Sequence, residues 1–541
     1  MIQKQREIMK KFGKITAIAL AAATLLCGCR KIDDAPFEYS SAESSVTSTD
    51  ETNKPDRMSD TYRPTEQTII RRSFAGRLEA ERAATNGTLR DMDGGLLNAN
   101  ENGYVSLNKG QYFTQVSTVA SSQFYRIILM ARSRTGASIS LGIGDSLEGT
   151  FYLSASDNSS DEFDLYAVDN VYMSVGMNTL KFTVESGTAE VDCVIIEDTG
   201  PVSSEVYTAS GVCATGNVTQ RTLSLLQALT TRYGEVVFTA QNVSCGSNAE
   251  IDAIFVETKR FPAIRTSELA LALKDDRNSL EILKTELELA KKWDADGGIV
   301  SYAWHWYSPN DLRGTTMNDY DLHAALDGVD PSELAVLDKD GMQMQLDNAL
   351  LPQGAADLVA DIDKLAETLK EFADADIPVI LEPIPDGDSG LFWWGQDAES
   401  YKALWTLIFD RLTKHNNLKN IIWVWNNSDF DFYPGDSYVD IVGQSIFEDT
   451  TSSFAGRLSA LASNPKLGRK AIAITACAAL PNINNMARDN ALWLWVAADS
   501  GAYIIDEYGR ISETHTKKTS LRMIYNNEKC ITLDELSNIW Y

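Results

Sequence analysis

The strongest constraint on the fold is a unit that recurs in the C-terminal part of the chain: a helix with one apolar face, followed by a short apolar strand. In the clearest copy, apolar side chains return every third or fourth residue just before the strand Pro378–Leu381, at Leu358, Ile362, Leu365, Leu369 and Phe372. This spacing places them along one face of a helix. Strands that alternate with such helices predict βαβ units and a parallel sheet.

The unit recurs often enough to close a barrel. Helical stripes also precede the strands Gly298–Trp304 and Asn420–Trp425. Further strand candidates are Val236–Ala240, Ala263–Thr266, Tyr438–Val442, Lys470–Thr475 and Leu492–Val496. Eight strands with helices between them, over residues 201–541, predict a (β/α)8 TIM barrel. An open doubly wound sheet would need a glycine-rich nucleotide turn, which we do not find in the sequence.

Residues 73–200 follow a different pattern, so the chain is expected to be multidomain. Short strands alternate or run apolar between turns rich in Gly, Asn, Asp and Ser: Phe124–Arg132, Ser138–Ile143, Thr150–Ser154, Thr179–Val184 and Val191–Ile196. Several short strands at this spacing predict a β-sandwich of the jelly-roll kind. A chain of 541 residues is also too long for one core.

The N-terminus has the pattern of a targeting segment. Five basic residues precede an apolar run from Ile15 to Leu26 that is too short to span a membrane, which indicates a signal peptide. The run ends Leu26-Cys27-Gly28-Cys29 and resembles the lipobox of bacterial lipoproteins. That resemblance implies a signal peptide over residues 1–29 and lipidation of Cys29; an ordinary secretory signal is the alternative. Residues 30–72, rich in Ser, Thr and acidic residues, predict a disordered tether.

The amino-acid composition limits the classes of partner that the chain can bind. A formal net charge of −28 argues against nucleic acid and anionic lipid surfaces, which need basic patches. A neutral polysaccharide is not repelled, and contact with a membrane is expected only through the lipid anchor. The cysteines after Cys29 are widely spaced, without a CxxC pair, so neither a disulfide framework nor a zinc site is predicted. We expect a monomer in the cell envelope, at the outer membrane of a Gram-negative bacterium, on its surface or periplasmic side.

Four predicted strand ends resemble glycoside hydrolase family 26, the β-mannanase family. They are Ser301–Pro309, which contains Trp-His-Trp-Tyr, then Glu382–Gly395, which ends Leu-Phe-Trp-Trp-Gly, then Tyr433–Phe447, and Ile474–Pro481. The resemblance extends to Val236–Gln241 and Ser247–Asp252 at the start of the barrel, and to Ile531–Leu536 at its end.

The resemblance also implies the site. The acid/base position of the family falls on Asp386 and the nucleophile position on Ala476, where the family has glutamates. Other family positions carry Glu382, Pro385, Leu391, Ser445 and Phe447 in place of the usual residues. The side chains implied to bind substrate are Trp304, His305, Trp306, Phe392, Trp393, Trp394, Phe447, Trp493 and Trp495. No cofactor is expected in the barrel.

Residues 73–200 resemble a family 35 carbohydrate-binding module through Leu78–Glu81, Asn102–Val105 and Val191–Val194. The resemblance implies a structural Ca²⁺ ion held by Glu79, Glu81 and Asp192, whose carboxylate oxygens suit a hard cation. The alternative is that the glutamates lie on a solvated edge.

Alanine has no attacking group, whereas a retaining glycosidase needs two carboxyl groups about 5 to 5.5 Å apart. The sequence therefore predicts a carbohydrate-binding lipoprotein, built on an inactive mannanase-like barrel, that binds β-mannan-type polysaccharide. The alternative is an active endo-β-1,4-mannanase that uses Asp386 and an unrecognised second carboxylate. Glu448 and Asp449 are candidates for that group in an inverting mechanism. A purely structural or adhesive surface protein is a third possibility.

Overall fold

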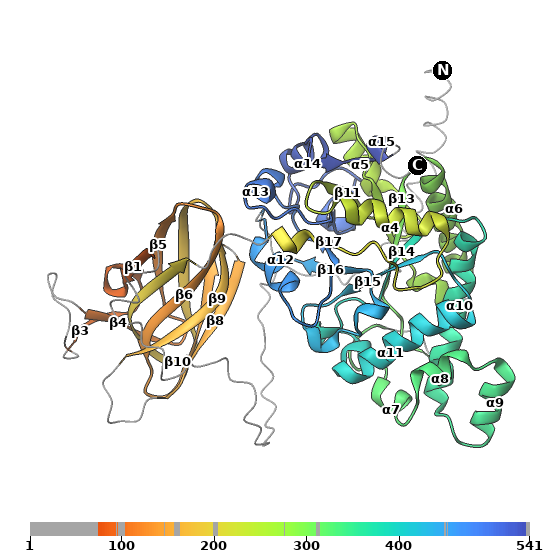
Figure 1. The fold of residues 1–541 in the computed structure, drawn as a ribbon, viewed down its shortest axis with the longest axis horizontal. Helices are drawn as coiled ribbons and strands as arrows, with labels where there is room; N and C mark the ends of the chain where they lie inside the picture. Colours follow the sequence, from red (N-terminus) through yellow and green to blue (C-terminus); the bar gives the residue numbers. More distant parts are fainter. Residues whose placement is uncertain are drawn as a thin grey trace. The chain divides into compact units, whose positions relative to one another are not determined.

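The computed structural model describes residues 74–92, 95, 103–144, 146–155, 163–198, 204–274, 276–309, 314–447, 451 and 453–536. The predicted signal peptide, Cys29, the tether 30–72 and the two acidic candidates Glu448 and Asp449 lie outside these residues. The described part contains both predicted folds, an antiparallel sheet domain followed by a closed parallel barrel (Figure 1).

The first domain is built on one long strand, β10 (Gly176–Asp198), which belongs to two antiparallel sheets. Its first half pairs with β5 (Tyr112–Val119) and β7 (Ala137–Ile143), and its second half pairs with β4 (Gly103–Asn108) and β6 (Gln123–Arg132). The remaining strands are β1 (Phe74–Glu79), β2 (Ala84–Thr85), β3 (Thr88–Asp91), β8 (Ser146–Leu153) and β9 (Asp164–Met173).

The sequence pattern predicted two strands where β10 is continuous. Between the two halves, Gly187 has a φ of +72°, and a Cβ there would lie 2.0 Å from the carbonyl oxygen of Gly136. Only glycine avoids this clash at a left-handed conformation. Gly187 therefore lets β10 pass from one sheet to the other without ending, although glycine in the sequence pattern indicated a turn.

The barrel has eight described parallel strands in the order of the chain. They are β11 (Val237–Asn242), β12 (Ile264–Glu268), β13 (Ile299–Trp304), β14 (Val379–Pro383), β15 (Ile421–Asn426), β16 (Ile441–Ile446), β17 (Ala471–Cys477) and β18 (Trp495–Ala498). Because β11 pairs with both β12 and β18, the sheet is closed. A short strand, β19 (Cys530–Ile531), also pairs with β11.

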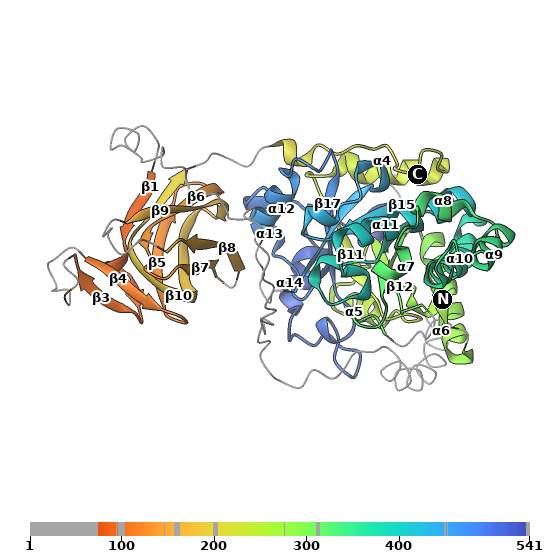
Figure 2. The ribbon, with the colours of Figure 1, turned by 90° about the horizontal axis from the view of Figure 1, so that it is seen from below.

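Helices cover the outside of these strands. The main ones are α4 (Gln220–Arg232), α5 (Ala249–Thr258), α6 (Arg277–Ala295), α10 (Gln353–Ala373), α11 (Ala398–Asp410), α12 (Ala455–Ala462), α13 (Ile483–Arg488), α14 (Lys518–Tyr525) and α15 (Leu533–Leu536). Helices α6, α10 and α14 lie at the periphery of the barrel in both views (Figures 1 and 2). Between β13 and α10 the chain adds α7 (Leu322–Leu326), α8 (Pro331–Val336) and α9 (Lys339–Asp347).

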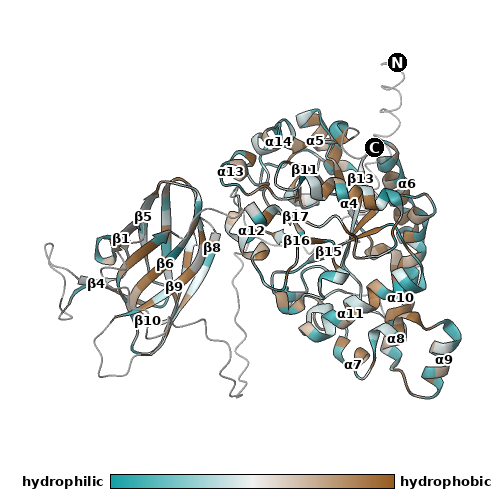
Figure 3. Cartoon of the chain, viewed as in Figure 1, coloured by the Kyte–Doolittle hydropathy of each residue, from teal (hydrophilic) through white to brown (hydrophobic). Residues whose placement is uncertain are grey.

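The predicted apolar stripes match the buried faces of the helices. The five stripe residues of α10 are all fully buried, whereas Leu280 of the predicted α6 stripe is 47% exposed. Figure 3 shows the hydrophobic strands enclosed by helices whose outer faces are hydrophilic. Among the helices in the described part of the chain, none has both the length and the apolar character that a membrane span requires.

Candidate active site

A cavity of about 120 Å³ lies at the C-terminal ends of the barrel strands, where barrel enzymes carry their active sites. We call it the strand-end cavity. Its lining residues are Asn242, Val243, Thr266, Ser267, Glu268, Ala303, His305, Glu382, Pro385, Asp386, Ser445, Phe447, Thr475, Ala476, Asp499 and Ser500. It therefore contains Asp386 and Ala476, the two positions that the family resemblance assigns to catalysis, together with three further carboxyl groups.

The backbone that leaves β14 is strained where it delivers Asp386. Ile384 has a φ of 44° and Asp386 a φ of 52°, both in the left-handed region, which a β-branched side chain such as that of Ile384 rarely adopts. The amide of Asp386 donates to the carbonyl oxygen of Asn426, at 2.9 Å. Such strain costs on the order of 1–3 kcal/mol at each residue and persists only where the surroundings enforce it. Because it is concentrated at the exit of β14, it indicates a functional site there.

A polar network at the base of the cavity joins four strands, β14 to β17. The hydroxyl of Ser445 donates to Asp386 Oδ2 at 3.0 Å, and the amide of Asn426 lies within 2.8 Å of both Ser445 Oγ and Glu382 Oε1. The hydroxyl of Thr475 also donates to Glu382, at 3.3 Å. The network fixes the orientation of both carboxyl groups.

A histidine and a glutamate form another part of the cavity wall. His305 Nδ1 lies 2.6 Å from Glu268 Oε2, and the backbone amide of His305 donates to Glu268 Oε1 at 3.0 Å. Glu268 Oε1 also accepts from the amides of Leu269 and Ala270. Glu268 is the last residue of β12, and His305 immediately follows β13, so adjacent strands bring them together.

These contacts move the pKa values of the cavity groups upward. Burial raises the pKa of Glu382 to about 7 and that of Asp386 to about 6, although hydrogen bonds to the ionised forms oppose the shift. Burial alone would lower the pKa of His305, but the charge and hydrogen bond of Glu268 raise it to about 9. At neutral pH the cavity therefore holds an imidazolium ion beside carboxyl groups, of which Glu382 is partly protonated.

The predicted substrate-binding residues divide into two groups. His305 and Phe392 are partly exposed, and Phe447 is 48% exposed. The other six are at most 2% exposed and leave no surface for a sugar: Trp304, Trp306, Trp393, Trp394, Trp493 and Trp495. We therefore correct the contact role predicted for these six, because their rings are buried in the hydrophobic core of the barrel.

The Trp-Trp-Gly segment shows one role of these buried rings. Trp394 stacks on Phe392 with ring centroids 4.5 Å apart, and its indole nitrogen donates to the carbonyl oxygen of Pro385 at 2.9 Å. A Cβ at Gly395 would lie 1.9 Å from the carbonyl oxygen of Gly387. The glycine allows this close approach, and the indole then holds the turn that carries Asp386.

Sequence reasoning missed Glu268, Asn426, Thr475 and Asp499. Asp499 directly follows the apolar strand β18, whereas Glu268 is the last residue of β12, whose sequence Ile-Arg-Thr-Ser-Glu is mostly polar. A carboxylate directly after an apolar strand was a detectable signal for Asp499, since strand ends meet around one opening.

The comparison with known families agrees with this geometry. A family model described as Glycosyl hydrolase family 26 matches residues 214–535, more than half of the chain and almost all of the barrel. The chain belongs to glycosyl hydrolase family 26. It is 27% identical over 378 residues to a mannan endo-1,4-beta-mannosidase of Thermothelomyces thermophilus, covering 68% of this chain and 71% of that protein. It is 24% identical over 443 residues to mannan endo-1,4-beta-mannosidase B of a Piromyces species, covering 78% and 72%.

Solved structures of family 26 share the fold. The Podospora anserina GH26-CBM35 β-(1,4)-mannanase matches with a TM-score of 0.55 at 23% identity, covering 86% of this chain and 99% of that chain. A ruminal GH26 endo-β-1,4-mannanase matches with a TM-score of 0.58 at 19% identity, covering 86% and 98%.

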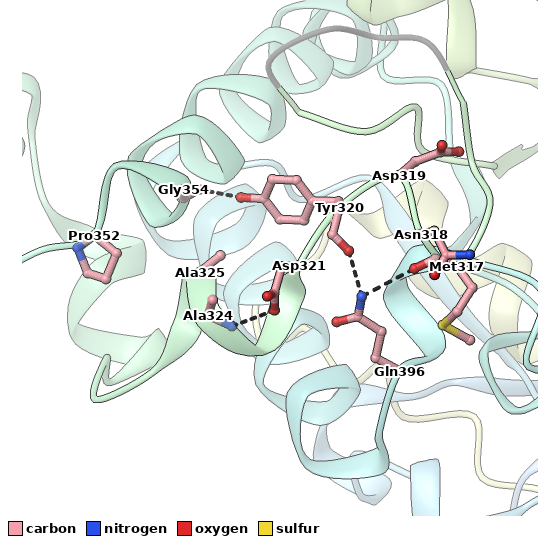
Figure 4. Close-up of a pocket in the computed structure, with 10 residues that line it drawn as sticks. All are labelled: Met317, Asn318, Asp319, Tyr320, Asp321, Ala324, Ala325, Pro352, Gly354 and Gln396. Atoms are coloured by element: carbon pink, nitrogen blue, oxygen red, sulfur yellow. Dashed lines mark hydrogen bonds between the residues drawn. The ribbon is translucent and has the colours of Figure 1, made fainter. Parts of the chain in front are cut away.

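A larger hollow, of about 610 Å³, lies on the insertion after β13 and shares no residue with the strand-end cavity. Figure 4 shows that its polar groups bind one another. The hydroxyl of Tyr320 donates to the carbonyl oxygen of Gly354, and the amide of Gln396 donates to the carbonyl oxygens of Met317 and Tyr320. These bonds hold the insertion together, so we assign the hollow a structural role.

The calcium ligands predicted in the first domain lie near one another. Single ligand atoms of Glu79, Asp192 and Cys193 fall within 4.8 Å of one another, and Glu81 Oε2 is buried without a hydrogen-bond partner. Arg77 donates to Glu79 at 3.0 Å and to Asp192 at 3.1 Å. The carboxylates of Glu79 and Asp192 suit a hard cation, which would have to displace the Arg77 guanidinium, but Glu81 is not among the residues whose ligand atoms lie within 4.8 Å of one another.

Proposed function

We propose that the barrel is an active endo-β-1,4-mannanase, an O-glycosyl hydrolase, in which Asp386 is the general acid. The observation that carries the proposal is the placement of Asp386: a strained turn presents it to a cavity that holds three other carboxyl groups. A pKa near 6 keeps part of the Asp386 population protonated in weakly acidic solution. The names of the relatives, mannan endo-1,4-beta-mannosidases, support β-mannan as the substrate class.

The proposed general acid transfers its proton to the glycosidic oxygen as the bond to the anomeric carbon breaks. The imidazolium of His305 lowers the pKa of Asp386 and so opposes the effect of burial. This balance leaves the pKa of Asp386 at about 6, so that a protonated carboxyl group is present in weakly acidic solution. Ser445 holds the Asp386 carboxyl through its hydrogen bond.

A second candidate function, binding without cleavage, is favoured by one observation. Ala476, at the family's nucleophile position, lines the cavity with a methyl group, so a covalent glycosyl intermediate cannot form there. In that case the barrel would be a catalytically inactive carbohydrate-binding site, with His305, Phe392 and Phe447 as its accessible side chains.

Incubation of mannohexaose with the full chain, followed by chromatography of the products, distinguishes the two functions. We expect shorter manno-oligosaccharides, and a loss of about 10²–10⁴-fold in rate in Asp386→Asn. The matched control is Asp431→Asn, since that aspartate is exposed and paired with Lys466 on the surface. Calorimetric binding of mannohexaose without any product would establish the binding function and reject hydrolysis.

We propose that the remaining parts of the chain bring this barrel to its polysaccharide. Residues 73–200 would act as a carbohydrate-binding module, and lipidation of Cys29 with the tether 30–72 would anchor the chain at the cell envelope. The support is the sequence resemblance described above and the sandwich fold of the described residues. Palmitate labelling of wild-type and Cys29→Ser cells tests the anchor, and labelling of both would reject it.

Calcium in the first domain is the final part of the proposal. Addition of Ca²⁺ to chelator-treated protein is expected to raise the melting temperature of wild type and to leave that of Glu81→Gln unchanged. The control, Glu205→Gln, removes one acidic group that lies outside the cluster and should respond like wild type. An equal response of all three proteins would reject the site.

A further inference from the structure

We propose that Asp499 is the general base of an inverting hydrolysis, with Asp386 as its acid partner across the strand-end cavity. This inference rests on the proposed function and deepens it, since it names the second carboxylate. Asp499 differs from the two candidates that the sequence suggested, Glu448 and Asp449, which lie outside the described residues.

The first argument is the position of the two strands. Asp386 follows β14 and Asp499 follows β18, and these strands are four places apart in a closed ring of eight. The two aspartates therefore enter the same cavity from opposite sides of the barrel. Inverting glycosidases place their carboxyl groups about 6.5–9.5 Å apart, wider than the retaining pair, so that a water fits between the base and the sugar.

The second argument is the space beside Asp499. The backbone amide of Asp499 donates to the carbonyl oxygen of Cys477 at 2.9 Å, so Asp499 lies alongside the end of β17 that carries Ala476. The alanine methyl leaves open the volume that a longer side chain would fill. The cavity, at about 120 Å³, is large enough for a water, which needs roughly 10–15 Å³.

The third argument is that the other two carboxyl groups of the cavity have other partners. Glu268 accepts three backbone amides and pairs with His305. Glu382 is 7% exposed, accepts from Asn426 and Thr475, and lies on the same strand that delivers Asp386. An inverting base must hold a water on the side of the sugar opposite the acid. Neither Glu268 nor Glu382 is placed to do so, because their hydrogen bonds hold them elsewhere.

The surroundings of Asp499 also suit proton uptake. Burial raises its pKa, Glu250 adds to this effect, and hydrogen bonds from the Ser500 amide and the Asn242 side chain oppose it, as does the charge of His305. A carboxylate with a raised pKa is a better base than a free aspartate, and the imidazolium of His305 limits how far the pKa of Asp499 rises.

The proposed step balances as follows. Asp499 removes a proton from the water as the water oxygen bonds to the anomeric carbon from the side opposite the leaving group. The bond from that carbon to the glycosidic oxygen breaks, and Asp386 donates its proton to the departing oxygen. The products are a free 4-hydroxyl group and a reducing end in the α configuration. Asp499 then returns its proton to solvent and Asp386 takes one up.

Proton NMR of mannohexaose during hydrolysis by the full chain tests this step. We expect the α-anomer to appear first, a loss of about 10²–10⁴-fold in kcat in Asp499→Asn, and unchanged calorimetric affinity for mannohexaose. The pH profile of Asp499→Asn should lack the acid limb of wild type, a change that a purely structural role would not produce. Asp506→Asn, which removes an exposed pair with Arg510 on the next loop, is the control.

Two outcomes overturn the inference while the proposed function stands: a β-anomer as the first product, or Asp499→Asn with more than a tenth of wild-type activity. If wild type binds mannohexaose and releases no product, the proposed function fails, and the inference fails with it. The three outcomes are separable in the same samples.

Discussion

The imidazole Nδ1 of His305 lies 2.6 Å from Glu268 Oε2, and this pair places a positive charge in the strand-end cavity. Neither residue adjoins the other in sequence; β12 and β13 bring them together. Glu268 raises the pKa of His305 to about 9, so the imidazolium persists through the neutral range. That charge in turn lowers the pKa of both Asp386 and Asp499.

Removal of the imidazolium should therefore shift the pH dependence of hydrolysis. In His305→Gln, Asp386 loses the neighbouring cation that lowers its pKa, so the pKa rises above about 6. Since the acid acts in its protonated form, the basic limb of the kcat/KM profile on mannohexaose should move to higher pH. A basic limb that stays in place or moves to lower pH would contradict this electrostatic role.

Restoring a carboxylate at position 476 should change the stereochemical outcome. Ala476→Glu places an attacking group on β17, and together with Asp386 on β14 it recreates the retaining pair. We expect NMR to detect the β-anomer as an early product, which wild type does not give. Ala476→Gln is the matched control, because it fills the same space without an attacking group, and it should only slow hydrolysis. An unchanged α-anomer in Ala476→Glu would show that the glutamate does not reach the anomeric carbon.

A buried ion pair should dominate the stability of one side of the barrel. Arg265 on β12 donates to Glu286 Oε2 on α6 at 2.9 Å, and both side chains are at most 1% exposed. Glu286→Gln should lower the free energy of unfolding by about 3–5 kcal/mol, because it leaves the guanidinium buried without its counter-charge. Denaturant titration at neutral pH measures this loss.

The same pair predicts a pH dependence. The pKa of Glu286 lies below its usual value, since Arg265 more than offsets the effect of burial. The stabilisation is therefore complete above the ordinary pKa of glutamate and is lost as the pH falls through the lowered folded-state pKa. The difference between wild type and Glu286→Gln should shrink in acid, and a difference that grew there would contradict the assignment. Lys291→Gln, at an exposed pair with Glu371, should change stability by less than about 1 kcal/mol.

The turn that carries Asp386 should tolerate no side chain at Gly395. Gly395→Ala introduces a Cβ only 1.9 Å from the carbonyl oxygen of Gly387, so the Trp393–Trp394 segment must shift. We expect a lower melting temperature and a loss of mannohexaose hydrolysis. Gly216→Ala is the control, since a Cβ there meets no atom within 4 Å. Equal effects of the two substitutions would show that the close approach at Gly395 is unimportant.

Much of the barrel fold could be predicted, because the helix of each βα unit shows a helical period of apolar residues in the sequence. The α10 stripe is buried as its spacing required, and the strand predicted at Pro378–Leu381 corresponds to β14 at Val379–Pro383. The strands of the β-sandwich were harder to predict from the sequence. Strands β1 to β5 and β9 escaped prediction, and β10 was divided at Gly187, because pairing between distant segments leaves little local signal.

The candidate site could be predicted only where a motif marked it. The resemblance placed Asp386 and Ala476, and both line the same cavity. The resemblance could not distinguish a tryptophan that contacts a sugar from one that is buried in the barrel, since both preserve the motif. Trp393, for example, is fully buried. Asp499 follows an apolar strand, which the sequence shows, but the position of β18 opposite β14 appears only when the barrel closes.

The most direct test of the account compares two substrates in Asp386→Asn. Mannohexaose needs a proton on its leaving oxygen, whereas a 2,4-dinitrophenyl β-mannobioside has a leaving group that departs without one. The account predicts that wild type cleaves both, and that Asp386→Asn loses about 10²–10⁴-fold on mannohexaose but far less on the dinitrophenyl substrate. An equal loss on both substrates, or no cleavage of either by wild type, would contradict the role of Asp386 as the general acid of a working mannanase.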